Sequence, residues 1–215
     1  MKTTIIFLFI FHVSFLGFSQ DLEMLTEEKY NNLFLSSKQD SINKVLIGKK
    51  AKDFKFRTMK GDSIQLSKLE GKPTIITIFY GVCNPCMREI PVINKLARKY
   101  AFQSVKFISI STQDTPESIK ALEHFLSTKN QDSAYIDEIT VVAASYAGEA
   151  YKIPQHKDFK NETKDFLKEN YLVDSAPMMF FIDREGVIQF ISVGYNMNYD
   201  YYPFYTTKIE ALLKE

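Results

Sequence analysis

The stretch PTIITIFYGVCNPCMREIP, residues 73–91, joins an apolar run to both cysteines of the chain, Cys83 and Cys86. A continuous run of β-branched and aromatic residues such as PTIITIFY is typical of a strand buried on both faces of a sheet. After the cysteines, apolar residues recur at helical spacing, namely Ile90, Ile93, Leu96, Ala97 and Tyr100. The two thiols are therefore expected where a buried strand ends and a helix begins.

Two thiols separated by two residues admit three roles: a structural staple, part of a metal site, or a reactive pair. A Cys83–Cys86 staple would contribute little, because the stabilisation by a disulfide grows with the loop that it closes. Zinc takes four nitrogen or sulfur ligands, or three with an open position. His124 and His156 stand in unrelated segments without zinc-site spacing. The sequence therefore predicts no metal site and no bound cofactor.

The reactive-pair interpretation fits the local context best. A helix N-terminus presents unpaired N–H groups and a partial positive charge, which stabilise a thiol as the thiolate. Cys83 is therefore expected to be the nucleophile. Cys86 lies one turn further in and is expected to be the more buried, resolving thiol.

The N-terminal segment MKTTIIFLFIFHVSFLGFSQ predicts a secretory signal peptide over residues 1–19. Lys2 precedes an apolar run, and the small residues Gly17 and Ser19 occupy the −3 and −1 positions of a cleavage site after Ser19. That run is 14 residues long, shorter than the roughly 20 that a membrane span needs. We therefore expect the chain to be exported to the bacterial periplasm. If the signal is not cleaved, it would anchor the chain in the membrane. With a net charge of +1 and no basic stripe, no nucleic-acid partner is predicted.

The remainder divides into an N-terminal extension, residues 20–46, and one domain, residues 47–215. A hairpin is expected around the turn KGD, and strands and helices then alternate before a final hairpin and helix. This order predicts an α/β protein with a mixed sheet covered on both faces. Beyond residues 73–100, strands are expected at 105–111, 139–144, 176–183 and 186–194, and helices at 115–129, 161–170 and 205–215.

Three motifs together resemble the thioredoxin fold and, within it, the secreted thiol–disulfide oxidoreductases of the TlpA/ResA type. Residues 47–73 are similar to that group's N-terminal hairpin and its lead into the first central strand. CNPCMREIP, residues 83–91, matches the pattern C-x-P-C-x-x-E-x-P. SAPMMFFIDREGVI, residues 175–188, is similar to the segment that carries a cis-proline, a strand and a turn.

The resemblance implies roles for three further residues. Glu89 would be the active-site acid, and its position three residues after Cys86 places it on the same side of a helix. Pro177 would be the cis-proline that faces the disulfide. The backbone of Ala176 could then add a strand-like contact to an extended substrate. The alternatives are an exposed helix glutamate and an ordinary trans-proline at a strand boundary.

The sequence also departs from the resemblance. Val82 stands where the family usually carries tryptophan, and Thr77 stands where relatives often have aspartate or asparagine. Without an ionisable group at position 77, more of the proton handling is left to Glu89 or to water. The stretch 145–168 is longer than usual, and it either reshapes the substrate groove or is a neutral surface insertion, which surface loops tolerate.

The expected function is disulfide exchange with exported protein substrates. The resemblance implies the reductive direction, which would need electrons from a membrane partner. A peroxiredoxin-like peroxidase is a second hypothesis, but it requires threonine three residues before the nucleophile, where Tyr80 stands. A non-catalytic binding module that presents the tyrosine-rich segment 195–205 is a third. That segment is expected to pack near the C-terminal helix, and the intact C-x-x-C-x-x-E motif favours catalysis.

Overall fold

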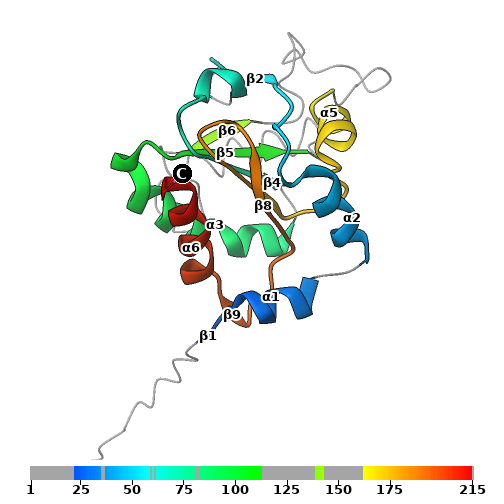
Figure 1. Ribbon diagram of the computed structural model, residues 1–215, viewed down its shortest axis with the longest axis vertical. Helices are drawn as coiled ribbons and strands as arrows, with labels where there is room; N and C mark the ends of the chain where they lie inside the picture. The colour runs from blue at the N-terminus through cyan, green and yellow to red at the C-terminus, as the bar shows by residue number, and fades with distance from the viewer. Residues whose placement is uncertain are drawn as a thin grey trace, which may run out of the picture.

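The computed structural model describes residues 22–34, 37–58, 60, 62–80, 83–112, 139–142 and 162–214. Within these ranges the centre of the protein is a five-stranded sheet with the strand order β6-β5-β4-β7-β8 (Figure 1). β4, β5 and β6 run parallel, whereas β7 is antiparallel to β4 and β8 is antiparallel to β7. The expected mixed sheet of an α/β protein is thus confirmed. The strands are β4 (Thr74–Phe79), β5 (Lys106–Ser111), β6 (Ile139–Val142), β7 (Met178–Ile182) and β8 (Ile188–Val193).

β4 is the central strand, and all of its residues are buried. Burial on both faces explains why its sequence, TIITIF, contains no charged residue and is dominated by β-branched side chains. Its Thr77 lies opposite Ser109 of β5 and Met179 of β7. The chain that leaves the carboxyl end of β4 passes into α3 (Asn84–Tyr100), so this end of the sheet positions the two cysteines.

Helices cover both faces of the sheet (Figure 1). Ile75 and Phe79 of β4 belong to a core shared with α3 and α6 (Tyr202–Lys214). Ile76 and Ile78 point the other way, into a core shared with α2 (Ser37–Leu46) and α5 (Glu162–Tyr171). The alternation of a strand's side chains between its two faces therefore divides the apolar interior into two layers.

The hairpin expected near the start of the domain is present. β2 (Lys55–Arg57) and β3 (Ser63–Gln65) pair in antiparallel register and lead into the short 3-10 helix η1 (Leu66–Leu69). η1 places Leu66 in the core beneath α2 and α5. The hairpin therefore caps the face of the sheet opposite α3.

The N-terminal segment before the domain is built into the core. β1 (Glu23–Met24) pairs in parallel with β9 (Tyr199–Asp200), and α1 (Glu27–Phe34) lies next to α6 (Figure 1). Tyr30 of α1 is only 2% exposed, and its hydroxyl accepts a hydrogen bond of 2.8 Å from the backbone N–H of Val193. Its ring packs on that of Phe204 at 5.1 Å. Packing against α6, more than local propensity, therefore stabilises this short helix.

α6 begins at Tyr202, three residues before the start expected from the sequence. The Asp200 carboxylate accepts a hydrogen bond of 2.9 Å from the Tyr202 N–H, and Pro203 in the first turn needs no such partner. The sequence did not indicate this helix start, because the tyrosine-rich segment 195–205 indicates core packing and not a capped helix start. The helix expected at 115–129, the signal peptide at 1–19 and residues 145–161 of the long stretch 145–168 lie outside the described residues.

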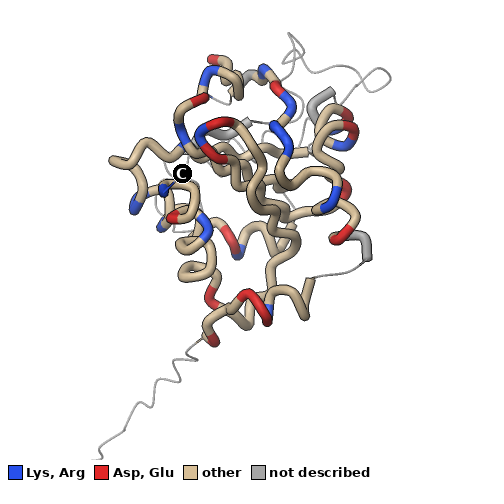
Figure 2. Tube along the Cα trace, in the orientation of Figure 1, with Lys and Arg blue, Asp and Glu red and all other residues tan. Residues whose placement is uncertain are grey.

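Charged positions are spread over the outer helices and loops, with acidic and basic residues interspersed, while the central strands are mostly uncharged (Figure 2). This pattern agrees with the small net charge of the chain, +1. In the part of the chain that the structure describes, no helix combines the length and apolar character needed to cross a membrane.

Candidate functional site

Cys83 and Cys86 form a disulfide at the start of α3, with their Cα atoms 5.2 Å apart. Cys83 is the N-cap residue of the helix, in an extended backbone conformation, and Cys86 lies in the first turn. The backbone N–H of Cys86 donates a hydrogen bond of 3.2 Å to the Cys83 sulfur. The sulfur of Cys83 thus takes the place that a serine or aspartate oxygen fills at other helix starts.

This capping position distinguishes the two sulfurs chemically. When the disulfide is reduced, a negative charge on Cys83 Sγ would be stabilised by the N–H of Cys86 and by the positive end of the helix dipole. The expected difference in burial is not seen, because both residues are 2% exposed. The helix start packs both side chains into the same core, so the hydrogen bond to Cys83 Sγ, and not burial, distinguishes the two sulfurs.

The segment before β7 brings Ala176 and Pro177 to the disulfide. The peptide bond between these two residues is cis, as the resemblance implies. The Ala176 carbonyl oxygen lies 3.8 Å from Cys83 Sγ, although 93 residues separate the two along the chain. The Pro177 carbonyl accepts a hydrogen bond of 2.9 Å from the Gly194 N–H, which holds this segment against the end of β8.

Glu89 is buried, with only 1% of its surface exposed, so it is not the exposed helix glutamate of the alternative interpretation. Its Oε1 accepts a hydrogen bond of 2.7 Å from the Tyr205 hydroxyl. Its Oε2 is buried and has no hydrogen-bond partner among the described residues. Burial raises the pKa of this carboxyl from 4.5 to about 7, against the opposing effect of the Tyr205 hydrogen bond. Glu89 can therefore both hold and release a proton near neutral pH.

Tyr205 is a residue whose contact with the site the sequence did not indicate. The expectation that segment 195–205 packs near the C-terminal helix is confirmed, since Tyr201 and Tyr205 are fully buried. Phe204, Tyr205, Ile209 and Leu212 are the buried residues of α6. A tyrosine among apolar residues on the buried side of a helix is the available signal, because a buried hydroxyl needs a partner.

The two sequence departures have different outcomes. Thr77 is buried, and its partners on the neighbouring strands are Ser109 and Met179. None of these three side chains is an acid or a base. Val82 lies outside the described residues, as do His124 and His156. Within the described ranges, no group of three or more histidine, cysteine, aspartate or glutamate side chains is arranged to hold a metal ion.

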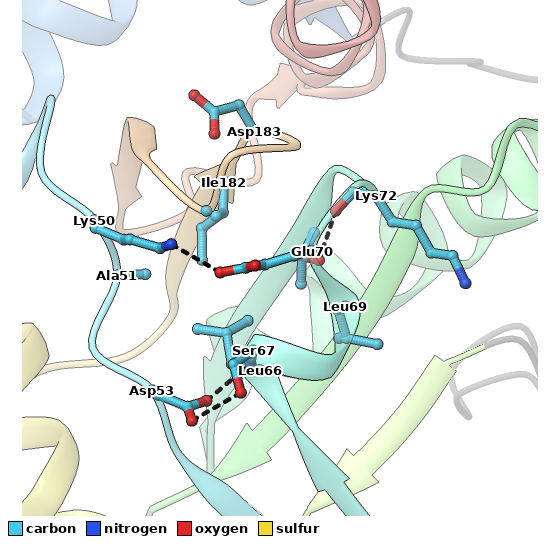
Figure 3. Close-up of a pocket in the computed structure, with 12 residues that line it drawn as sticks. Lys50, Ala51, Asp53, Leu66, Ser67, Leu69, Glu70, Lys72, Ile182 and Asp183 are labelled. Carbon is cyan, nitrogen blue, oxygen red and sulfur yellow. Dashed lines mark hydrogen bonds and ion pairs between the residues drawn. The ribbon is translucent and has the colours of Figure 1, made fainter.

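A small cavity of about 50 Å³ lies elsewhere on the protein (Figure 3). Thr74, the first residue of β4, lines it, so it lies at the opposite end of the sheet from the cysteines. Its polar side chains bind one another: Lys50 pairs with Glu70 at 2.8 Å, and Asp53 accepts a hydrogen bond of 2.8 Å from the Ser67 N–H. This cavity is therefore not part of the redox site.

A cysteine pair at the start of a helix, placed at the carboxyl end of the central strand and next to a cis-proline, defines a thioredoxin-fold thiol–disulfide oxidoreductase. Residues 47–191 match the AhpC/TSA family. The chain is 31% identical over 145 residues to thiol-disulfide oxidoreductase ResA of Bacillus thuringiensis subsp. konkukian, covering 67% of this chain and 68% of that protein. It is 24% identical over 147 residues to thioredoxin-like protein YneN of Bacillus subtilis, covering 68% and 71%.

The fold also agrees with a solved structure described as thiol:disulfide interchange protein DsbE from Chlorobium tepidum. The TM-score is 0.57 at 23% identity, and the match covers 78% of this chain and 97% of that one. The chain belongs to the AhpC/TSA family and, within it, to the ResA-like thiol–disulfide oxidoreductases.

Proposed function

We propose that the protein is a disulfide reductase for exported protein substrates. The observation that carries the proposal is the hydrogen bond from the Cys86 N–H to Cys83 Sγ at the start of α3. It singles out one sulfur of the pair for stabilisation as a thiolate, which is the attacking species in disulfide exchange.

The reaction proceeds in two exchanges from the reduced enzyme. The Cys83 thiolate attacks one sulfur of a substrate disulfide, forms a mixed disulfide and releases the other substrate sulfur as a thiolate. The Cys86 thiolate then attacks Cys83 Sγ, which restores the Cys83–Cys86 disulfide and releases the second substrate thiolate. The substrate gains two electrons, and both released thiolates take up protons.

Glu89 supplies the proton handling for the second exchange. Cys86 must lose its proton before it attacks, and Glu89 lies one turn further along the same helix. With a pKa of about 7, the carboxyl is matched to a proton that must be taken up and returned near neutral pH. We assign it the role of general base in the resolving step and of acid in the reverse reaction.

Ala176 and Pro177 form the substrate-binding edge of the site. Ala176 is half-buried, and its carbonyl oxygen lies beside Cys83 Sγ. An extended substrate that hydrogen-bonds to this backbone would present its disulfide to Cys83 in the manner of an added strand. The cis bond at Pro177 turns the chain at this point into β7.

Continuous turnover needs two electrons per cycle from outside the protein. The predicted signal peptide at residues 1–19 supports a location in the periplasm. A membrane protein that donates electrons through its own thiols would then be the partner. The resemblance to ResA-type oxidoreductases supports the reductive direction.

The test is reduction of insulin by the mature protein in the presence of a thiol reductant, with the variants Cys83→Ser and Cys86→Ser. We expect wild-type turnover, no activity in Cys83→Ser, and a trapped mixed disulfide with substrate in Cys86→Ser. Failure of Cys86→Ser to trap substrate would refute the order of attack, and equal turnover in all three proteins would refute the enzymatic role.

Peroxide consumption separates this function from that of a thiol peroxidase. Tyr80 is half-buried and directly follows β4. It occupies the position three residues before Cys83, where the peroxidase hypothesis requires threonine. We expect hydrogen peroxide to be consumed no faster by the wild type than by Cys83→Ser. Rapid consumption that depends on Cys83 would favour the peroxidase instead.

A further inference from the structure

Three side chains from three different elements form a buried chain of hydrogen bonds that ends at Glu89, three residues after Cys86 on α3. Glu89 of α3 accepts from the Tyr205 hydroxyl of α6 at 2.7 Å. The same hydroxyl lies 3.1 Å from Ser192 Oγ of β8. Each of these residues is at most 1% exposed, so the chain of hydrogen bonds is closed off from bulk water.

The protons in this chain have one consistent order for each state of Glu89. When the carboxyl is ionised, Tyr205 donates its single proton to Glu89, and Ser192 must then be the donor to Tyr205. When the carboxyl is protonated, the order can reverse, so that Glu89 donates to Tyr205 and Tyr205 to Ser192. Both hydroxyls serve as donor or acceptor, which a backbone group or a phenylalanine ring cannot do.

This reversal matters because a buried polar group without a partner is costly. A carboxyl that exchanges its proton in every cycle must be accommodated in two charge states at the same place. A group that can only donate would favour the ionised carboxylate alone. A hydroxyl pair can donate to the carboxylate or accept from the protonated carboxyl, so it stabilises both forms. Such a partner suits an acid that works in both directions.

We propose that Tyr205, held by Ser192, is a positioning residue that keeps Glu89 hydrogen-bonded in both protonation states and so sets the pH range over which the redox pair exchanges protons. The inference rests on the proposed function, since it concerns the acid of the same site. Tyr205 acts through Glu89 and need not touch the substrate.

Other ionisable groups face Glu89 from the elements packed around it. Tyr30 of α1, Tyr195 after β8 and Tyr201 before α6 lie within electrostatic reach of the carboxylate, and Cys86 precedes it by one turn. The hydroxyls of Tyr30 and Tyr201 accept hydrogen bonds from backbone N–H groups at or just after the end of β8. Burial raises the pKa of each of these tyrosines, so they stay neutral over the pH range in which Glu89 titrates.

The direct test is a titration of the Glu89 side-chain carboxyl by ¹³C NMR in the oxidised mature protein. Tyr205→Phe keeps the ring and removes the hydroxyl, and a bond to a charged group is stronger than one to the neutral form. We therefore expect the midpoint to rise by about one pH unit, a tenfold increase in proton affinity. An unchanged midpoint in the folded variant would overturn the proposal.

Tyr171→Phe is the matched control. Tyr171 is also buried, and its hydroxyl donates a hydrogen bond of 2.6 Å to the Lys52 carbonyl, but it belongs to the core on the opposite face of the sheet. It removes one buried hydroxyl in the same way and should leave the Glu89 midpoint in place. A similar shift in both variants would reveal a general loosening of the core and would overturn the proposal.

Ser192→Ala is the second variant, and it keeps the proposal testable if Tyr205→Phe does not fold. It removes the anchor of the Tyr205 hydroxyl without touching Glu89. We expect a smaller rise of the Glu89 midpoint, and an unchanged or lowered midpoint would count against the chain of hydrogen bonds.

The activity readout separates this inference from the function on which it rests. The pH profile of insulin reduction should move to higher pH in Tyr205→Phe by the same amount as the NMR midpoint, and it should not move when the change is made in a Glu89→Gln background. A wild type without disulfide exchange refutes the proposed function, while the NMR titration still decides the role of Tyr205. An active enzyme with an unmoved profile and midpoint refutes only the role of Tyr205.

Discussion

Replacement of Glu89 by glutamine should remove the pH dependence that this residue imposes on stability. In the folded protein burial raises the pKa of the Glu89 carboxyl from 4.5 to about 7, so the folded state binds more protons than the unfolded state between these values. Stability from this group is therefore complete below about pH 4.5 and falls as the pH rises toward 7. A displacement of this size corresponds to a loss of about 3 kcal/mol.

Glutamine has nearly the same shape and keeps the Oε1 acceptor for the Tyr205 hydroxyl, but it has no proton to lose. The difference in unfolding free energy between Glu89→Gln and wild type should therefore move by about 3 kcal/mol in favour of the variant between pH 4.5 and pH 8. Any constant offset, such as that from an unpaired amide N–H at the Oε2 position, cancels in this comparison.

The measurement is urea denaturation at several pH values. The proteins are kept oxidised, because disulfide-bonded cysteines do not titrate. Glu169→Gln, the same substitution at an exposed position of α5, controls for the loss of one surface charge. If the stability difference between Glu89→Gln and wild type is the same at pH 4.5 and pH 8, ionisation of the buried Glu89 carboxyl does not destabilise the wild type, and this prediction is wrong.

Three further substitutions test the packing around the site. Gly194→Ala should lower stability by about 1–3 kcal/mol, because Gly194 has a φ of +77° and a Cβ there would lie 2.6 Å from the Phe34 ring; an unchanged melting temperature would contradict this. Tyr30→Ala should cost about 3–5 kcal/mol in urea denaturation, since the ring is buried between α1 and α6. Glu27→Gln removes an ion pair of 2.8 Å between Lys208 and a largely exposed glutamate, so it should cost less than about 1 kcal/mol. A larger loss of stability in Glu27→Gln than in Tyr30→Ala would show that charge, and not packing, stabilises α1 against α6.

Local sequence predicted the elements around the disulfide well. The run TIITIF and the helical spacing after Cys86 are strong signals, because each depends on residues that are neighbours along the chain. The same holds for the hairpin at residues 55–65 and for the helix at 162–171. The start of α6 was predicted late, because its capping group, Asp200, lies among aromatic residues that carry no periodic signal.

The sequence by itself determined that two thiols stand at the start of a helix behind a buried strand, with an acid one turn further along. Helix geometry alone brings Cys83, Cys86 and Glu89 near one another. Only the tertiary structure decided that the Ala176 carbonyl reaches Cys83 across 93 residues and that Tyr205 reaches Glu89 across 116. These contacts depend on how β7 and α6 pack against α3. Packing is a property of the whole core, and no local pattern of residues records it.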